Sequence, residues 1–400
     1  MYPLCFNIFE KHYFCDSSHR LHSEMIYLDN AATSRFKPKC VTDALIYDLA
    51  HSANAGRSGH SESVKKTLAT EDCRAFLTEK LGGKDDFELI FTKNCTEALN
   101  LAIFGSVKRG DKVVTTKNEH NSVLRPLYKL KNDGVIDLQI ATVDESGRVD
   151  YADLKEKAKG ANLIAVGGAC NVTGAIADMD EIGKIAKSTG AKLLVDGAQS
   201  VPCVDTDMQR YGVDMLALPA HKGLHGVQGV GALAVRKGTQ LTPLLFGGTG
   251  ARSNELAPEI IFPESFEAGT QFSGGISALH QGAKWTFDNL QKIRKNTVRL
   301  SKNLVYALKN IGAKVYTRDF ATGVVSFNID GVDSGYIADY LDEYGVCVRA
   351  GLHCAPLVHE HLHTLDKGAV RASIGCDNTD KEINAFVTLV ENFARKLRDR

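Results

Sequence analysis

The sequence predicts an α/β protein with a mainly parallel central sheet and a smaller α+β domain at its C-terminal end. Short apolar runs bounded by Gly or Asp alternate with longer helical stretches along most of the chain, as expected for strands covered by helices on both faces. Near residue 285 the pattern changes to one long helical stretch followed by short strands and helices. The chain has 400 residues, which is enough for one large and one smaller domain.

In the large domain, predicted helices and strands follow one another. A helix is predicted over 63–81 because the helical pattern stops at Gly82-Gly83. The strands predicted after it are 88–91, 112–116, 137–143, 162–166, 192–195 and 213–218, and the main helices between them are 96–104, 121–132 and 179–188. This alternation is typical of a mostly parallel sheet.

Three segments are predicted: a peripheral extension over 1–24, a large domain over 25–285 and a small domain over 286–400. The extension is aromatic-rich, lacks a basic start and has no small-residue cleavage site, so it is not predicted to be a signal peptide. Met25 opens a clearer pattern of a short strand and a turn. The small domain begins with a helix predicted over 285–308.

Composition excludes several classes of protein. Lys plus Arg number 48, as do Asp plus Glu, and this balance argues against a partner with a nucleic-acid backbone. No apolar run approaches the roughly 18 residues of a membrane helix, so no membrane association is expected. The ten cysteines are scattered without a CxxC pair, which favours reduced thiols in a cytoplasmic protein over a disulfide framework.

Polar residues gather in the loops that follow the predicted strands, where open α/β sheets bind their ligands. The loop 92–100 starts a helix whose free N–H groups suit an anion, although a helix cap is the simpler explanation of this loop alone. The next loops place His120 before a helix start and Asn171 in a turn. Each of these residues, taken singly, has an ordinary structural explanation.

The last two loops of this series carry a carboxylate and an amine. Asp196 ends a buried strand, which is costly without a partner, so a functional and a capping role are equally favoured. Lys222 follows in a Gly-rich turn about one helix-and-strand unit later, at the same edge of the sheet. Together the loops offer phosphate donors, an imidazole, an amide, an acid and a lysine, the set that a pyridoxal phosphate (PLP) enzyme needs.

These motifs resemble those of the class V aminotransferase family and, within it, the cysteine desulfurases of the branch that mobilises sulfur for iron–sulfur clusters. The resemblance runs from about Tyr27 to about Val390. It implies an aspartate-aminotransferase-like PLP fold and a homodimer. Selenocysteine lyases share the same residues. A transaminase, an epimerase, a β-lyase or a PLP-binding scaffold without turnover remains an alternative.

The resemblance also implies a role for each cofactor-binding residue. In AHKG, Lys222 would hold PLP as a Schiff base and His221 would lie near the phosphate. In DGAQS, Asp196 would pair with the pyridine nitrogen and Gln199 with the ring hydroxyl. The others are Asn171 at the hydroxyl, His120 stacked on the ring, Cys95 and Thr96 at the phosphate, and Thr270 of EAGT at the phosphate of the partner subunit.

The motif RAGLHCAP, residues 349–356, resembles the desulfurase signature with Cys354 as the nucleophile. Arg349 and His353 are expected to favour its thiolate. A buried, inert thiol is the alternative, but the polar Gly/Pro loop argues against it. The expected substrate-binding residues are Arg371, which would clamp the carboxylate, Arg349, Asn171 and Arg57.

The implied reaction converts L-cysteine to alanine. Lys222 would move the Cα proton, His120 would shuttle protons, and Cys354 would take the sulfur as a persulfide and pass it to an acceptor protein.

Two features fall outside this scheme. Pro219, three residues before the Schiff-base lysine, replaces the usual Ser or Thr of the family, so a phosphate site short of one donor is expected. The alternating His359, His361 and His363 suggest a metal site. Because no further ligand lies near them in the sequence, a solvated loop and no metal are expected.

Overall fold

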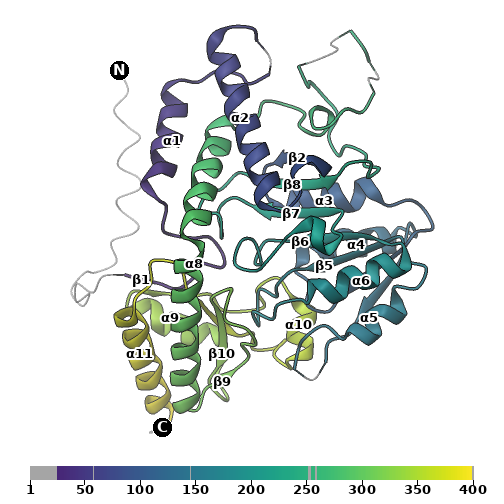
Figure 1. Cartoon of the computed structure of the whole chain (residues 1–400). Coiled ribbons are helices and arrows are strands. Elements are labelled where there is room, and N and C mark those ends of the chain that lie inside the picture. Colours follow the sequence, from purple (N-terminus) through teal and green to yellow (C-terminus); the bar gives the residue numbers. More distant parts are fainter. Residues whose placement is uncertain (1–24, 57, 145, 251–253, 257–258, 399–400) are drawn as a thin grey trace, which may run out of the picture.

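The computed structural model describes residues 25–56, 58–144, 146–250, 254–256 and 259–398 (Figure 1). The predicted extension over 1–24 therefore lies outside the described residues. Within the described part, the central sheet has seven strands in the order β2-β8-β7-β6-β5-β3-β4. The strands are β2 (Phe87–Thr92), β3 (Lys112–Thr116), β4 (Asp137–Ala141), β5 (Leu163–Gly167), β6 (Lys192–Asp196), β7 (Met215–Pro219) and β8 (Gly231–Arg236).

The sheet is parallel from β4 through β7, and β8 pairs antiparallel with both β7 and β2. This confirms the predicted mainly parallel α/β sheet. The predicted strand 137–143 ends early, at Ala141. Val143 instead forms a bridge with Val149 across the next turn.

Helices cover both faces of the sheet, and successive strand residues alternate between them. Leu163 and Ala165 of β5 join the core under α3 (Cys95–Ser106) and α4 (Asn121–Asn132). Ile164 and Val166 join the core of the opposite face. The helices of that face are α2 (Ser61–Lys80), α5 (Tyr151–Lys157), α6 (Met179–Thr189), α7 (Met208–Tyr211) and the first half of α8 (Ser273–Asn310).

The longest helix, α8, joins the two ends of the molecule. Figure 1 shows it running from beside α1 (Lys39–Ala50) and α2 down to α11 (Asp380–Arg398). It begins at Ser273, earlier than the predicted residue 285. The first turn contains Gly274 and Gly275, which are weak helix formers, so the local sequence did not indicate that the helix begins there. The predicted domain boundary at 285 falls inside this helix and stays a prediction.

The C-terminal part has its own small core. Within the described residues, its antiparallel sheet has the order β12-β10-β9, formed by β12 (Val370–Ser373), β10 (Val324–Asn328) and β9 (Lys314–Val315). The sheet packs against the second half of α8, α9 (Ser334–Glu343) and α11. The first described residues also lie here, because β1 (Ile26–Tyr27) pairs with β11 (Val346–Cys347) and Leu28 is buried in this core.

The remaining short elements are the 3₁₀ turns η1 (Lys84–Asp86) and η2 (Glu264–Phe266) and the helix α10 (Pro356–His361). In the described residues, no helix combines the length and the apolar character needed to cross a membrane. The cysteines that the structure describes are all free thiols.

Candidate active site

The loops that follow β2, β3, β5, β6 and β7 surround one cavity of about 120 Å³ at the carboxyl edge of the sheet. Parallel strands bring these segments together although they are far apart in the sequence. Most of the residues predicted to bind the cofactor line this cavity: Cys95, Thr96, His120, Asn171, Asp196, Gln199, His221 and Lys222.

Lys222 lies in the tight turn after β7, facing the buried carboxylate of Asp196. Burial lowers the pKa of the Lys222 amine, and the negative charge of Asp196 partly opposes this effect. The turn is held close to α8: a Cβ on Gly282 would lie 2.5 Å from the carbonyl oxygen of Leu224. A lysine whose amine loses its proton readily is suited to nucleophilic and base chemistry.

Asp196 ends β6 and is only 6% exposed. Its Oδ1 accepts hydrogen bonds from the backbone N–H of Ala198 at 2.9 Å and from the thiol of Cys95 at 3.7 Å. Burial and the nearby Asp196 charge raise the pKa of Cys95 well above its usual range, so this thiol stays protonated. The side chain of Cys95 points to Asp196. The predicted contact of Cys95 with the phosphate would therefore be made by its backbone N–H.

The start of α3 forms the anion-binding end of the cavity. Asn94 caps this helix, its Oδ1 accepting from the N–H of Glu97 at 2.9 Å. The N–H groups of Cys95 and Thr96 also belong to the first turn, which has no helical carbonyls to pair with them and attracts negative charge. Pro219 lines the same cavity and brings no N–H or hydroxyl, as the sequence indicated.

His120 caps α4 and is neutral. The backbone N–H of Ser122 donates to its Nδ1 at 3.0 Å, so the ring carries its proton on Nε2. Burial lowers the pKa of His120 to about 4.

Glu119, beside His120 in the sequence, is a wall residue to which the sequence analysis gave no role. It is 1% exposed, and its Oε1 accepts a hydrogen bond from Thr116. Burial raises the pKa of the Glu119 carboxyl to about 8. It is therefore mostly protonated near neutral pH.

Gln199, His221 and Asn171 connect the cavity to the rest of the molecule. Gln199 Nε2 donates to the carbonyl of Ala31 at 3.0 Å, and the carbonyl of His221 accepts from the N–H of Ser34 at 3.0 Å. Burial lowers the pKa of His221 to about 4. The side-chain atoms His221 Nδ1 and Asn171 Oδ1 are buried without a hydrogen-bond partner in the described structure, which leaves them available to a bound group.

Cys354 lies beside this cavity and is tied to it through its backbone. Its carbonyl accepts a 2.7 Å bond from the N–H of Asn121, directly after His120. The carbonyl of His353 accepts a 2.7 Å bond from Asn171 Nδ2. The thiol itself is partly exposed and accepts from Arg349 Nη2 at 3.8 Å.

The expectation that His353 helps to ionise Cys354 by its charge is wrong. Burial, reinforced by the nearby Arg371 charge, lowers the pKa of His353 to about 2, so its ring is neutral. Of the two predicted cations, Arg349 alone faces the thiol with a positive charge.

Arg371 is 1% exposed in β12. Its Nη2 donates to Asp29 Oδ1 at 3.1 Å and its Nη1 to the carbonyl of Asn171 at 3.2 Å. Asp29 is another residue that the sequence analysis missed. The backbones of Arg349 and Arg371 form an antiparallel β-bridge, so the two arginines lie side by side on neighbouring segments.

One residue predicted to bind the cofactor does not line this cavity. Thr270 is exposed and absent from its lining. The segment before it is anchored by Glu267, which pairs with Arg74 at 2.9 Å and accepts from the N–H of Phe91. Arg57 lies outside the described residues.

The alternating histidines after Cys354 do not form the solvated loop that was expected. Pro356 occupies the first turn of α10, and His359 in that helix is 0% exposed. The neighbouring residue Val358 packs in a small core with Cys170 and Val172 of the loop after β5. Among the described residues, no group of His, Cys, Asp and Glu is arranged to hold a metal ion.

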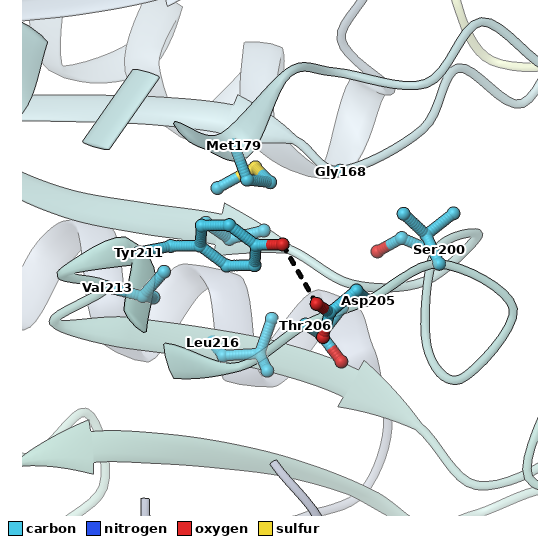
Figure 2. Close-up of a pocket in the computed structure, with 10 residues that line it drawn as sticks. Gly168, Met179, Ser200, Asp205, Thr206, Tyr211, Val213 and Leu216 are labelled. Atoms are coloured by element: carbon cyan, nitrogen blue, oxygen red, sulfur yellow. Dashed lines mark hydrogen bonds between the residues drawn. The ribbon is translucent and has the colours of Figure 1, made fainter. Parts of the chain in front are cut away.

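A second cavity lies deeper, between α6, α7 and the sheet (Figure 2). Its volume is about 10 Å³, roughly the space of one water molecule. Tyr211 crosses it and donates to Asp205 at 3.0 Å. This cavity is too small for a substrate.

The chain is similar to known proteins along most of its length. The model of the family "Aminotransferase class-V" matches residues 26–386. The chain belongs to the class V aminotransferase family. A probable cysteine desulfurase of Pyrococcus abyssi is 36% identical to this class V chain over 390 residues, covering 94% of this chain and 96% of the relative. A probable cysteine desulfurase of Methanothermobacter thermautotrophicus is 33% identical, covering 92% and 94%.

Solved structures of the class V family show the same fold. An apo cysteine desulfurase from Thermococcus onnurineus superposes with a TM-score of 0.85 at 34% identity, covering 93% of this chain and 95% of that one. The cysteine desulfurase CsdA from Escherichia coli gives a TM-score of 0.81 at 26% identity, covering 93% and 95%. The predicted fold class is thereby confirmed.

Class V enzymes depend on PLP, and the residues of this cavity fit that cofactor. The cavity has an enclosed lysine, a buried carboxylate opposite it and a helix start that favours an anion. Asn171 Oδ1 and His221 Nδ1 also have no hydrogen-bond partner among the described residues, and a polar cofactor would satisfy them.

Proposed function

We propose that this chain is a PLP-dependent cysteine desulfurase, which converts L-cysteine to L-alanine and passes the sulfur to an acceptor protein. The observation that carries the proposal is the attachment of the Cys354 loop to the cofactor cavity. The Asn121 backbone and the Asn171 side chain hold that loop, and Arg349 faces its thiol. Relatives named as cysteine desulfurases along nearly the whole chain support the same activity.

PLP, when bound, supplies an acceptor for the electrons released at the substrate Cα. In the proposal Lys222 attaches the cofactor, Asp196 pairs with its ring nitrogen, and the start of α3 holds its phosphate. Gln199 and Asn171 would lie near its hydroxyl, His120 against its ring and His221 near its phosphate. The lowered pKa of Lys222 allows the amine to take up the Cα proton.

The sulfur step requires a thiolate at Cys354. The Cys354 Sγ forms a bond to the substrate sulfur while the substrate Cβ–S bond breaks and leaves its electron pair on carbon. The carbon then takes up a proton and alanine is released. Arg349 Nη2 lies 3.8 Å from Sγ and would place a positive charge beside the reacting sulfur. Neutral His120, with its proton on Nε2, is proposed to supply or receive protons in this step.

Arg371 is proposed to bind the substrate carboxylate. A guanidinium suits a carboxylate because it offers two parallel donors. Asp29 and the carbonyl of Asn171 fix the Arg371 fork, and Arg371 Nε is buried without a partner in the described structure. Arg349 and Asn171 are proposed as additional substrate contacts.

A homodimer is also part of the proposal. Apolar side chains of α1 and α2 are exposed beside a groove of about 460 Å³: Ile46, Leu49, Val64 and Leu68. Exposed apolar surface of this kind favours a protein partner. In a dimer, the anchored segment that ends at exposed Thr270 would reach the phosphate of the partner. A cytoplasmic role in iron–sulfur cluster assembly is proposed with it.

The test is incubation of the yellow purified protein with L-cysteine. Alanine and a persulfide on Cys354 are both expected, detected by amino-acid analysis and mass spectrometry. In the Cys354→Ser variant, cysteine is expected to change the absorption spectrum of the cofactor as in wild type, but sulfide production is lost. Retention of full sulfur transfer by that variant contradicts the mechanism, and a transaminase, epimerase or β-lyase is then favoured. Measuring turnover on L-selenocysteine alongside L-cysteine distinguishes a cysteine desulfurase from a selenocysteine lyase.

A further inference from the structure

His353 and Cys354 have a backbone conformation that few residues other than glycine adopt. Their φ angles are 49° and 58°, so two successive non-glycine residues are left-handed. Such residues are uncommon, and a strained backbone persists only where surrounding contacts fix it. The side chain of His353 is one such contact, because it is 2% exposed and its Nε2 lies 2.9 Å from the carbonyl of Ala369.

That contact determines where His353 carries its proton. The Ala369 oxygen only accepts, so Nε2 bears the hydrogen and Nδ1 has a lone pair. His353 Nδ1 is buried and has no hydrogen-bond partner in the described structure. A buried acceptor without a partner is costly, so a donor is expected nearby.

The ring of His359 lies next to that of His353, with centroids 5.7 Å apart and planes tilted by 40°. His359 is 0% exposed, and its Nδ1 lies 2.8 Å from the hydroxyl of Thr364. When this hydroxyl donates to Nδ1, the His359 hydrogen resides on Nε2, the second atom of the pair that is buried without a partner. The two rings are therefore neighbours, and each has one buried nitrogen without a hydrogen-bond partner in the described structure: an acceptor on His353 and a donor on His359.

Neither ring acts through charge. Burial lowers the pKa of His359 to about 4, and that of His353 is lower still, at about 2. Both imidazoles are therefore neutral near neutral pH, and their mutual arrangement depends on tautomer and packing.

We propose that His359 is a positioning residue for the reactive thiol: through His353 it fixes the left-handed backbone that presents Cys354 to the cavity. The chain of contacts runs from Thr364 through His359 and His353 to the carbonyl of Ala369. From the other side, Asn171 and Asn121 hold the carbonyls of His353 and Cys354. The inference rests on the proposed sulfur transfer for its meaning, but the geometry of the loop is testable without it.

The test compares three variants of the full-length protein with its cofactor. His359→Phe keeps a ring in the core but offers no N–H, whereas His359→Gln keeps an amide donor near the Nε2 position. His361→Phe, in the same helix, is the matched control. Two readouts are used: the rate of iodoacetamide alkylation at Cys354, followed by mass spectrometry of its peptide, and the steady-state constants for L-cysteine.

His359→Phe is expected to alkylate Cys354 about tenfold faster, because the loosened loop exposes the thiol, and to lower kcat about tenfold with KM nearly unchanged. KM is spared because Lys222 and Arg371 are untouched. His359→Gln restores both values towards wild type, and His361→Phe leaves them unchanged. Equal behaviour of the Phe and Gln variants, or wild-type alkylation in His359→Phe, overturns the inference.

Two further outcomes are separable. If His359→Phe does not fold, Thr364→Val removes the hydroxyl at His359 Nδ1 while keeping the shape of the side chain, and a smaller change in the same direction is expected. Wild-type alkylation in that variant counts against the proposal. If the wild-type protein forms no alanine from L-cysteine, the proposed function fails, whereas the alkylation comparison still decides the role of His359.

Discussion

Two carboxyl groups, those of Asp196 and Glu119, line the cofactor cavity in different surroundings. Asp196 faces Lys222 and accepts from a backbone N–H and a thiol, all of which suit a negative charge. Glu119 is buried, and the effect of burial on its pKa outweighs the opposing effects of the Thr116 hydroxyl and the Gly167 backbone. Near neutral pH Glu119 is therefore a mostly protonated, neutral acid in the wall of the cavity.

Glu119 makes the stability of the protein depend on pH. Its pKa is raised from 4.5 to about 8 on folding, so between these values the folded state holds a proton that the unfolded state has lost. The stabilising contribution is complete below about pH 4.5 and is lost as the pH rises to about 8, by at most about 1.4 kcal/mol per pH unit. Glu119→Gln does not lose this contribution, so its free energy of unfolding is expected to rise relative to that of wild type as the pH rises.

Urea unfolding of both proteins at several pH values between about 5 and 8 measures the difference. Glu79→Gln, on the exposed face of α2, is the matched control. If the difference in free energy of unfolding between wild type and Glu119→Gln stayed constant across this range, Glu119 would be ionised throughout.

The sequence predicted the residues of the site that sit in strand-to-helix loops, because such loops meet at one sheet edge whatever the details of packing. Eight of the predicted cofactor residues line the same cavity. Asp29 was missed because its partner Arg371 is 342 positions away, so no local pattern marks it. Glu119 was missed because its pKa depends on Gly167 of β5 and Asp196 of β6, which lie in other segments of the chain.

At the scale of elements, the contact between α8 and the Lys222 turn determines how closely the turn approaches the sheet. Gly282 of α8 leaves room for the carbonyl of Leu224 and the N–H of Gly226, which a Cβ would meet at 2.5 and 2.9 Å. Backbone atoms on both sides prevent an easy adjustment. The first half of α8 thus supports the lysine turn directly.

Gly282→Ala is expected to destabilise the protein by about 1–3 kcal/mol and to weaken PLP binding, because the Lys222 turn must shift. Gly274→Ala, in the same helix, is the control, since its Cβ would meet only side-chain atoms of Asp48 and Leu45 at 3.2 Å. Chemical unfolding and cofactor titration measure the two effects. Equal stability of both variants would contradict the close contact.

Helices and strands with a clear apolar period were predicted well, and those that depend on tertiary contacts were not. The helix 121–132 matches α4, and the strand 112–116 matches β3. The start of α8 was missed because of its paired glycines. The helix α10 was missed because its histidines suggested a polar loop, whereas Val358 of this helix packs in one core with Cys170 and Val172 from another part of the chain.

At the scale of the whole molecule, the exposed apolar residues of α1 and α2 predict self-association. Leu49 and Leu68 are 66% and 59% exposed. In a dimer that uses this face, Leu68→Lys places a charge in the interface and shifts the protein from twice 43.5 kDa towards the single-chain mass. Sedimentation equilibrium measures the mass.

Tyr336→Lys, at an exposed aromatic residue of α9, is the control for that experiment and is expected to leave the mass unchanged. A wild-type protein that sediments as a single chain argues against the dimer. The same mass shift in both variants places the contact elsewhere.

The unbroken path of α8 limits how the molecule can open. At about 1.5 Å per residue its 38 residues span about 57 Å, and its two halves belong to two different cores. Hinge motion concentrates in loops or at the ends of elements, and α8 offers neither between the cores. We therefore expect substrate to enter through rearrangement of the short segments around the cavity, on the timescale of loop motions, while both halves of the protein move as one body.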